Sequence, residues 1–146
     1  MRILDDLRQM KPTREAAEQF MASFSQEEWR KNIRRVFGQA AETVIAQSER
    51  EDRNSAAKHA VRLKNTLDNW DTILKICEEE LPPTDIIASL MENLGMPMYP
   101  SDIDVTTQDT RDALDYSRDI RDKFLTSTLL WDLGLLYTWE LPRTVR

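Results

Sequence analysis

Residues 55–81 read SAAKHAVRLKNTLDNWDTILKICEEEL, and this stretch decides the fold class. Its large apolar residues recur in alternating steps of four and three, the spacing of one face of an α-helix. They are Leu63, Leu67, Trp70, Leu74, Cys77 and Leu81. We predict a long helix from about Ser55 to Glu80, packed against a long partner. A free-standing coiled coil is the alternative, but Ile73 and Ile76 widen the apolar stripe beyond a narrow seam.

The preceding residues carry the same pattern in a second segment. Ser25 and Glu28 have the S-x-x-E spacing of a capping box, which marks the start of a helix. The apolar stripe that follows comprises Trp29, Ile33, Val36, Phe37, Ala40 and Val44. We predict one helix that ends in the polar residues 49–55 and packs antiparallel to the helix of residues 55–80. Gly38 lies inside it, where we expect close packing to be the reason for a glycine.

Shorter helices are predicted before and after this pair. Ile3 to Met10 has helical spacing and is expected to be the tail of a helix. Thr13 can cap a short helix through Phe20 and Met21. After Pro82-Pro83, residues 84–94 are expected to form a helix that ends at Gly95. Its core-facing side chains are predicted to be Ile86, Ile87, Leu90, Met91 and Leu94.

Two more helices are predicted towards the C-terminus. Thr106 or Thr107 caps the first. Its apolar stripe comprises Ala113, Tyr116, Ile120 and Phe124. The second is an apolar run, Leu129, Leu130 and Leu133, that closes at Gly134. We therefore predict an all-α multi-helix bundle, with two long antiparallel helices followed by shorter packed helices. Residues 1–137 form a single helical domain and residues 138–146 a tail.

Composition favours the same fold class and limits the function. Three glycines in 146 residues are too few for an all-β fold or a phosphate-binding glycine loop. The net charge of -6 disfavours non-specific binding to nucleic acid or an anionic membrane. One cysteine, acids at residues 5 and 6, and no run of about 20 apolar residues predict a cytoplasmic protein without an internal disulfide.

No residue qualifies as catalytic, cofactor-binding or metal-ligating from the sequence alone. A metal site needs about three ligands, and His59 is the only histidine, so we expect it on the helix surface or at the core edge. Cys77 lies on the apolar stripe and is expected to be a small buried side chain. Glu78-Glu79-Glu80 are expected to form a solvated face. We therefore name no site residue and no cofactor for this chain.

The C-terminal third is rich in alternating charges. Arginines interleave with aspartates at spacings of three and four, which is typical of ion pairs along a helix. The residues are Asp102, Asp104, Asp109, Arg111, Asp112, Asp115, Arg118, Asp119, Arg121 and Asp122. They lack the D-x-[DN]-x-[DN]-G pattern of a calcium loop. We expect ordinary ion pairs along a helix, such as Asp115 with Arg118 and Arg118 with Asp122.

Several short motifs also occur in one order. They are Leu81-Pro82-Pro83-Thr84-Asp85-Ile86-Ile87, Leu94-Gly95-Met96-Pro97, Pro100-Ser101-Asp102-Ile103, Arg118-Asp119-Ile120-Arg121-Asp122-Lys123-Phe124 and Leu129-Leu130-Trp131-Asp132-Leu133-Gly134-Leu135-Leu136. This order resembles the C-terminal end of bacterial sn-glycerol-1-phosphate dehydrogenases, LP…I…L…GAP…P…I…(I)RDRYT…LL…LGLL. Upstream, Arg34-Arg35-Val36-Phe37-Gly38, Leu63-Lys64-Asn65 and Asn69-Trp70 resemble the middle of the same helical domain. The likeness runs from about Leu4 to Tyr137.

The resemblance implies the helical C-terminal domain of the dehydroquinate synthase-like and iron-containing alcohol dehydrogenase-like superfamily. Similar enzymes reduce dihydroxyacetone phosphate with NADH or NADPH, using a divalent metal held by one Asp and two His. None of those ligands matches a residue here, and the chain is expected to begin just after the second His. A role for Arg118 and Arg121 in pairing helices and capping carbonyls is expected, with binding of a substrate phosphate as the alternative.

Three functions remain open at this point. The first is a helical domain of a metal-dependent NAD(P) dehydrogenase, not catalytic by itself, whose partner is a missing nucleotide-binding domain or a second copy of the chain. The second is a free-standing helical interaction module that self-associates or binds a partner protein. The third is an independent enzyme with an unrecognised site. The composition and spacing of the residues do not decide among them.

Overall fold

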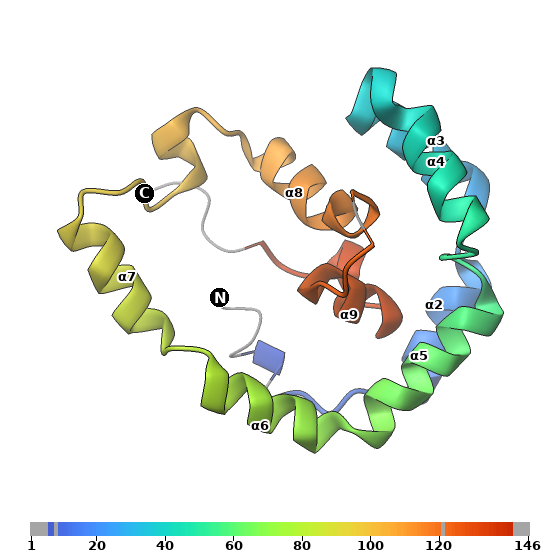
Figure 1. Ribbon diagram of the computed structural model, residues 1–146, viewed down its shortest axis with the longest axis horizontal. Helices are drawn as coiled ribbons and strands as arrows, with labels where there is room; N and C mark the ends of the chain where they lie inside the picture. Colours follow the sequence, from blue (N-terminus) through green and yellow to red (C-terminus); the bar gives the residue numbers. More distant parts are fainter. Residues whose placement is uncertain (1–5, 8, 121, 142–146) are drawn as a thin grey trace.

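The computed structural model describes residues 6–7, 9–120 and 122–141. Within these ranges the chain is all-α, as predicted, and contains no β-strand. The helices follow an open arc from α3 and α4 through α5, α6 and α7, and α8 and α9 lie on the inner side of that arc (Figure 1). None of the helices in the described ranges is long and apolar enough to cross a bilayer.

The α-helices are seven to thirteen residues long, and short 3-10 turns lie between several of them. Their bounds are α2 Arg14–Ser23, α3 Gln26–Phe37, η1 Gly38–Ala40, α4 Ala41–Arg50, α5 Ala56–Asp68, α6 Trp70–Glu80, α7 Thr84–Asn93, η2 Pro100–Ile103, α8 Thr107–Tyr116, η3 Ser117–Asp119, α9 Thr126–Asp132 and η4 Leu136–Thr138. Residues 6, 7 and 9 are also helical, whereas Ile3, Leu4 and the tail residues 142–146 lie outside the described ranges.

The segment predicted as one helix after Ser25 is an antiparallel hairpin of α3 and α4. Ser25 caps α3 as expected, since its side chain accepts a hydrogen bond from the Glu28 N–H. Gly38 has φ +51°, and a Cβ at this position would meet nothing within 4 Å. The prediction that Gly38 serves close packing is therefore wrong. This glycine ends α3 because its backbone angles are ones that other residues rarely adopt.

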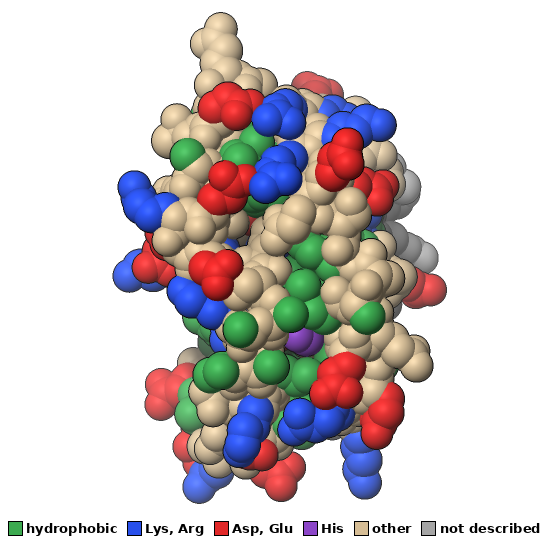
Figure 2. All heavy atoms as spheres, turned by 90° about the vertical axis from the view of Figure 1, so that its right-hand side faces the viewer, with side chains coloured by type: hydrophobic (Ala, Val, Ile, Leu, Met, Phe, Trp, Pro, Cys, Tyr) green, Lys and Arg blue, Asp and Glu red, His purple; other side chains and the backbone are tan. Residues whose placement is uncertain are grey.

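Ion pairs confirm that the two arms of this hairpin run in opposite directions. Arg34 pairs with Glu42 and Arg30 pairs with Glu49, each at 2.7 Å. The surface formed by this side of the molecule carries acidic and basic side chains intermixed around a band of apolar ones (Figure 2). Such exposed pairs contribute little to stability, so the hairpin depends on the apolar side chains beneath them.

The long helix predicted over residues 55–80 is broken at Asn69 into α5 and α6. Asn69 has φ −116° and ψ 17°, outside the helical region, and its side-chain amide donates to the Asn65 carbonyl. The polar side chain thus competes for a backbone carbonyl at the break. Two continuous long helices are therefore absent from the described ranges. Antiparallel packing of the two predicted segments against each other stays a prediction.

Two apolar clusters hold the helices together. The larger joins the N-terminal segment, α2, α5, α9 and η4, and its fully buried members are Leu7, Ala17, Leu63, Leu129, Leu130, Trp131, Leu133 and Leu136. The smaller joins α3, α4 and α8, and contains Trp29, Ile33, Ala41, Ile45 and Tyr116. Phe24 packs against both clusters, so the loop between α2 and α3 connects them.

Several predicted core positions on α6, α7 and after α8 are exposed instead. No residue of α6 or α7 is fully buried. Among the side chains predicted to face inward, the exposed large ones are Ile76, Leu81, Ile86, Leu90, Leu94, Ile120 and Phe124, and the small Ala40 and Ala113 are exposed as well. The helix predicted through Phe124 ends at Tyr116, followed by the turn η3, so the helical period that placed Ile120 and Phe124 inward no longer applies.

The predicted helix ends agree with the structure at three places. Thr106 and Asp109 form a capping box at the start of α8. Gly95 follows α7 with φ +64°, and Gly134 follows α9 with φ +75°. The two glycines differ in their surroundings: a Cβ at residue 134 would lie 2.8 Å from the Phe20 Cβ, whereas one at residue 95 would meet nothing within 4 Å.

This difference predicts that Gly134→Ala destabilises the protein much more than Gly95→Ala. Both variants force alanine into a left-handed conformation, which costs about 1–2 kcal/mol. Gly134→Ala also forces α9 away from α2, at about 1–3 kcal/mol for overpacking. The free energy of unfolding of each variant, measured by urea denaturation, checks this. Equal losses for the two variants would show that α2 and α9 do not pack as closely as described.

Candidate functional site

Trp131 on α9 is the centre of the larger core. It is fully buried, and Phe20, Phe24 and His59 each meet its ring edge-on, with ring centroids 5.3–5.4 Å away. Each of these edge-to-face contacts contributes about 0.5–1.5 kcal/mol beyond area burial. A single indole therefore joins α2, α5 and α9, and it fixes the position of the polar residues around it.

Arg118 lies over the face of this tryptophan. Its guanidinium carbon is 4.1 Å from the ring centroid, and that of Arg62 is 5.6 Å away. Arg118 is only 1% exposed although it follows α8 in the short turn η3. A guanidinium on an indole face gains about 2 kcal/mol or more when desolvated, which offsets part of the cost of burying the charge.

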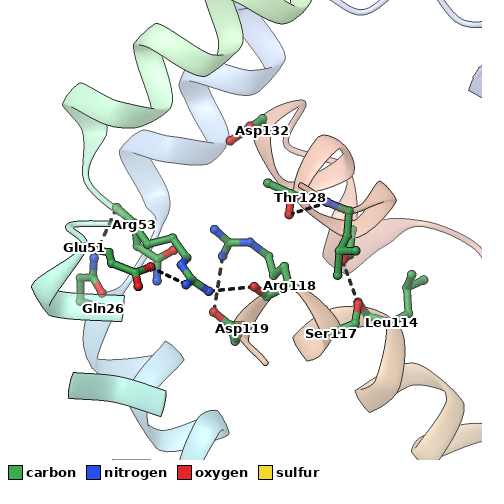
Figure 3. Close-up of polar contacts among 12 residues, drawn as sticks. Gln26, Glu51, Arg53, Leu114, Ser117, Arg118, Asp119, Thr128 and Asp132 are labelled. Atoms are coloured by element: carbon green, nitrogen blue, oxygen red, sulfur yellow. Dashed lines mark hydrogen bonds and ion pairs between the residues drawn. The ribbon is translucent and has the colours of Figure 1, made fainter. Parts of the chain in front are cut away.

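The Arg118 side chain has no hydrogen-bond partner among the described residues. None of its three guanidinium nitrogens is bonded, and its nearest carboxylate, Asp119, is 3.9 Å away. Figure 3 shows this side chain extending from η3 towards Arg53 and Asp132. The backbone carbonyl of Arg118 accepts a 2.9 Å hydrogen bond from Arg53 Nη1. Its charge is thus buried without the bonds that a buried arginine needs.

Arg62 and Asp132 form the second buried ionic element beside the tryptophan. Arg62 Nε lies 3.0 and 2.9 Å from the two Asp132 carboxylate oxygens, and Nη2 lies 2.8 Å from Oδ1. Asp132 is fully buried. The Asp132 carbonyl oxygen lies 2.9 Å from His59 Nε2. Because a carbonyl only accepts, the Nε2 nitrogen of His59 carries the proton.

Burial controls the pKa values of the charged groups in this cluster. Burial lowers the pKa of Arg118, and the nearby Asp119 acts in the opposite direction. Burial also raises the pKa of Asp119, against the influence of Arg118 and of the Trp29 indole. On α8, burial raises the pKa of Asp115 although Arg111 donates to its carboxylate. Burial therefore disfavours the charged forms of Arg118, Asp119 and Asp115, and the opposite charges beside them only partly offset that effect.

A pocket of about 320 Å³ opens next to this cluster, between the α4–α5 connection and the residues after η3. Positive side chains outnumber negative ones in its lining. It is lined by Glu51, Arg53, Lys58, Arg62, Arg118, Asp122, Lys123, Phe124 and Thr128. Carboxylates pair with two of these cations, at 2.5 Å from Glu51 to Arg53 and 2.8 Å from Asp132 to Arg62.

Several of the residues singled out from the sequence differ from their predicted burial or bonding. His59 is buried and bonded instead of lying at a surface or core edge, and Cys77 is only half-buried. Glu78, Glu79 and Glu80 are exposed, as predicted. Arg118 caps no carbonyl with its side chain, contrary to the expected role, and Arg121 lies outside the described residues.

Asp115, which is almost fully covered, does pair with Arg111 four residues earlier, but the expectation of ordinary helix ion pairs is wrong for Arg118 and Asp119. Both of these residues lie in the interior. Their spacing is that of solvated helix pairs, but η3 breaks the helix and turns Arg118 and Asp119 inward. Trp131, placed between Leu130 and Asp132 at the end of an apolar run, was a signal that could have located this cluster.

Comparisons with protein-family models, with curated proteins and with solved structures find no match to this chain. Among the described residues no group of three or more His, Cys, Asp or Glu side chains is arranged to hold a metal ion.

The Arg62–Asp132 pair predicts a large difference between two arginine substitutions. Arg62→Met leaves the buried Asp132 carboxylate uncompensated and should lower the free energy of unfolding by about 3–5 kcal/mol. Arg34→Met removes an ion pair of similar length whose two side chains are both more than half exposed. This variant should change the free energy of unfolding little. Urea denaturation of both variants checks this. Similar stabilities for the two variants would contradict a buried, structural pair.

The raised pKa of Asp119 predicts a pH dependence of stability. Its folded pKa lies above the unfolded value of about 3.9, so its ionisation disfavours the folded state. The stability of the wild type relative to Asp119→Asn should therefore fall as the pH rises from about 4 through the folded pKa, and then become constant. Urea denaturation of both proteins between pH 4 and 8 measures this difference. A difference that does not vary with pH would contradict the raised pKa.

Proposed function

We propose that this chain serves as the helical domain of a sn-glycerol-1-phosphate dehydrogenase-like enzyme and is not catalytic by itself. The observation that carries the proposal is where the resembling motifs lie in the fold. Eight of their residues are buried, Trp131 and seven others: Arg118, Asp119, Leu129, Leu130, Asp132, Leu133 and Leu136. The order of residues that resembles the family is therefore also the order that fixes the packing of η3, α9 and η4.

The exposed apolar residues of α6 and α7 support a partner domain. Ile86, Leu90 and Leu94 are spaced by four, so they lie on one face of α7, and each is more than half exposed. Ile76 on α6 is exposed in the same way. A row of exposed aliphatic side chains is typical of a surface that another domain covers. In the proposed enzyme a nucleotide-binding domain would supply NAD(P) binding, and the metal ligands would precede this chain.

A chimera tests the proposal. This chain would replace the corresponding helical segment, after the second metal-binding His, of a bacterial sn-glycerol-1-phosphate dehydrogenase. We expect dihydroxyacetone phosphate reduction by the chimera with NADH or NADPH, and none by the chain alone. The control is the same chimera carrying Trp131→Ala, which should lose activity because the core of the domain is lost.

One result of the chimera experiment would contradict the proposal. A chimera that folds, binds NADH and binds the metal, yet has no turnover, would show that this domain does not complete the dehydrogenase site. NADH fluorescence and metal analysis establish the first two conditions independently of turnover. If an inactive chimera does not bind NADH or the metal, the junction is moved by a few residues within the connecting loop. NADH binding, metal binding and turnover are then measured for that second chimera.

The second candidate is a free-standing helical module that self-associates or binds another protein. The same exposed residues of α7 favour it, since they could be covered by a second copy as well as by another domain. An antibody against residues 138–146 separates the two in a lysate of the source cells. A band well above 17.1 kDa favours the domain of a larger enzyme, and a single band near 17.1 kDa favours the module.

A further inference from the structure

We propose that the pocket beside Arg118 binds a small oxyanion of the phosphate class. The proposal stands on the residues of this chain and does not depend on the dehydrogenase-like function. Its first element is the buried Arg118 guanidinium, which has no hydrogen-bond partner among the described residues and belongs to the pocket lining. A buried guanidinium without hydrogen bonds, in a low-dielectric setting, attracts an anion more strongly than an exposed one does.

The second element is the balance of charge in the lining. Of its five cationic side chains, Arg53 and Arg62 are paired with carboxylates. Among the described residues Lys58, Arg118 and Lys123 have no carboxylate within hydrogen-bond distance. Lys58 donates instead to the backbone carbonyl of Glu51, which carries no net charge. Three cations therefore face the pocket with only Asp122 and the more distant Asp119 to oppose them.

The third element is the arrangement of these cations. The Arg118 guanidinium is covered, whereas the Lys58 and Lys123 residues are exposed, so the buried charge lies beneath the pocket and the two lysines are on its accessible side. An oxyanion would bond to the lysine ammonium groups and to the Thr128 hydroxyl while it neutralises Arg118 from above. Figure 3 shows Arg118 and Thr128 on the same side of the close-up, opposite Arg53 and Glu51.

The size and surroundings of the pocket select the kind of anion. A volume of about 320 Å³ accommodates inorganic phosphate or a small phosphate monoester. Glu51 and Asp122 at the pocket would repel a long polyanion such as a nucleic acid, as does the net charge of -6. Phe124, which is largely exposed at the edge, offers an apolar contact for the organic part of a monoester.

Titration of the purified chain with inorganic phosphate at constant ionic strength, followed by calorimetry, tests the inference. Chloride at the same ionic strength is the reference. We expect saturable binding of phosphate and none of chloride. Lys58→Met and Lys123→Met should each weaken phosphate binding by about tenfold, because each removes a charge-assisted hydrogen bond. Lys31→Met, which removes an exposed lysine that does not line the pocket, should leave the affinity unchanged.

Arg118→Met should abolish binding, and circular dichroism would show whether that variant remains folded. Because Lys58 and Lys123 are exposed, their variants decide the question even if Arg118→Met unfolds. Phosphate affinity that is the same in wild type, Lys58→Met and Lys123→Met would overturn the inference, as would heat that grows without saturation. An inactive dehydrogenase chimera would leave this result untouched, so failure of the proposed function and failure of the anion site are separately visible.

Discussion

The rest of the structure depends on the stacking of the Arg118 guanidinium on the buried indole of Trp131, at 4.1 Å. Trp131 lies where α2, α5 and α9 meet, and the rings of Phe20, Phe24 and His59 stand nearly perpendicular to its own. A planar guanidinium can stack on an indole, and Arg118 covers Trp131 in this way. The arginine at this position brings a positive charge into the core, where it lies beside the carboxyl groups of Asp119 and Asp132.

Those contacts divide the charges of the core into two kinds. Asp132 is neutralised by Arg62 with three hydrogen-bond contacts, so this pair fixes α9 against α5. Arg118 and Asp119 are adjacent in sequence, and their closest side-chain atoms lie 3.9 Å apart, which is too far for a hydrogen bond. One charge pair thus acts as a structural clamp, and the other leaves a cation beneath a pocket. Both arginines lie beside the same buried tryptophan, but only Arg62 is close enough to a carboxylate to form hydrogen bonds.

The sequence predicted the helical class, the helix start at Ser25 and the helix ends at Gly95 and Gly134, because caps and apolar periods act over a few residues. It did not predict the helix breaks at Gly38 and Asn69, where the apolar period continues across the break. It also assigned Arg118 and the aspartates near it to ordinary helix ion pairs, since their spacing suits a continuous helix. The end of α8 at Tyr116 reverses that assignment, and only tertiary packing around Trp131 decides it.

In part of this chain, charged side chains are buried and aliphatic side chains are exposed, which is the reverse of the usual distribution. Charged side chains enter the core at η3 and α9, while aliphatic ones remain exposed along α6 and α7. Each arrangement alone lowers the stability of an isolated domain, because a charge without bonds and an apolar face in water both raise its free energy. A partner covering α7 and an oxyanion beside Arg118 would each bind the folded state only, and so would stabilise it by linkage. Both proposals therefore predict a domain that gains stability from what it binds.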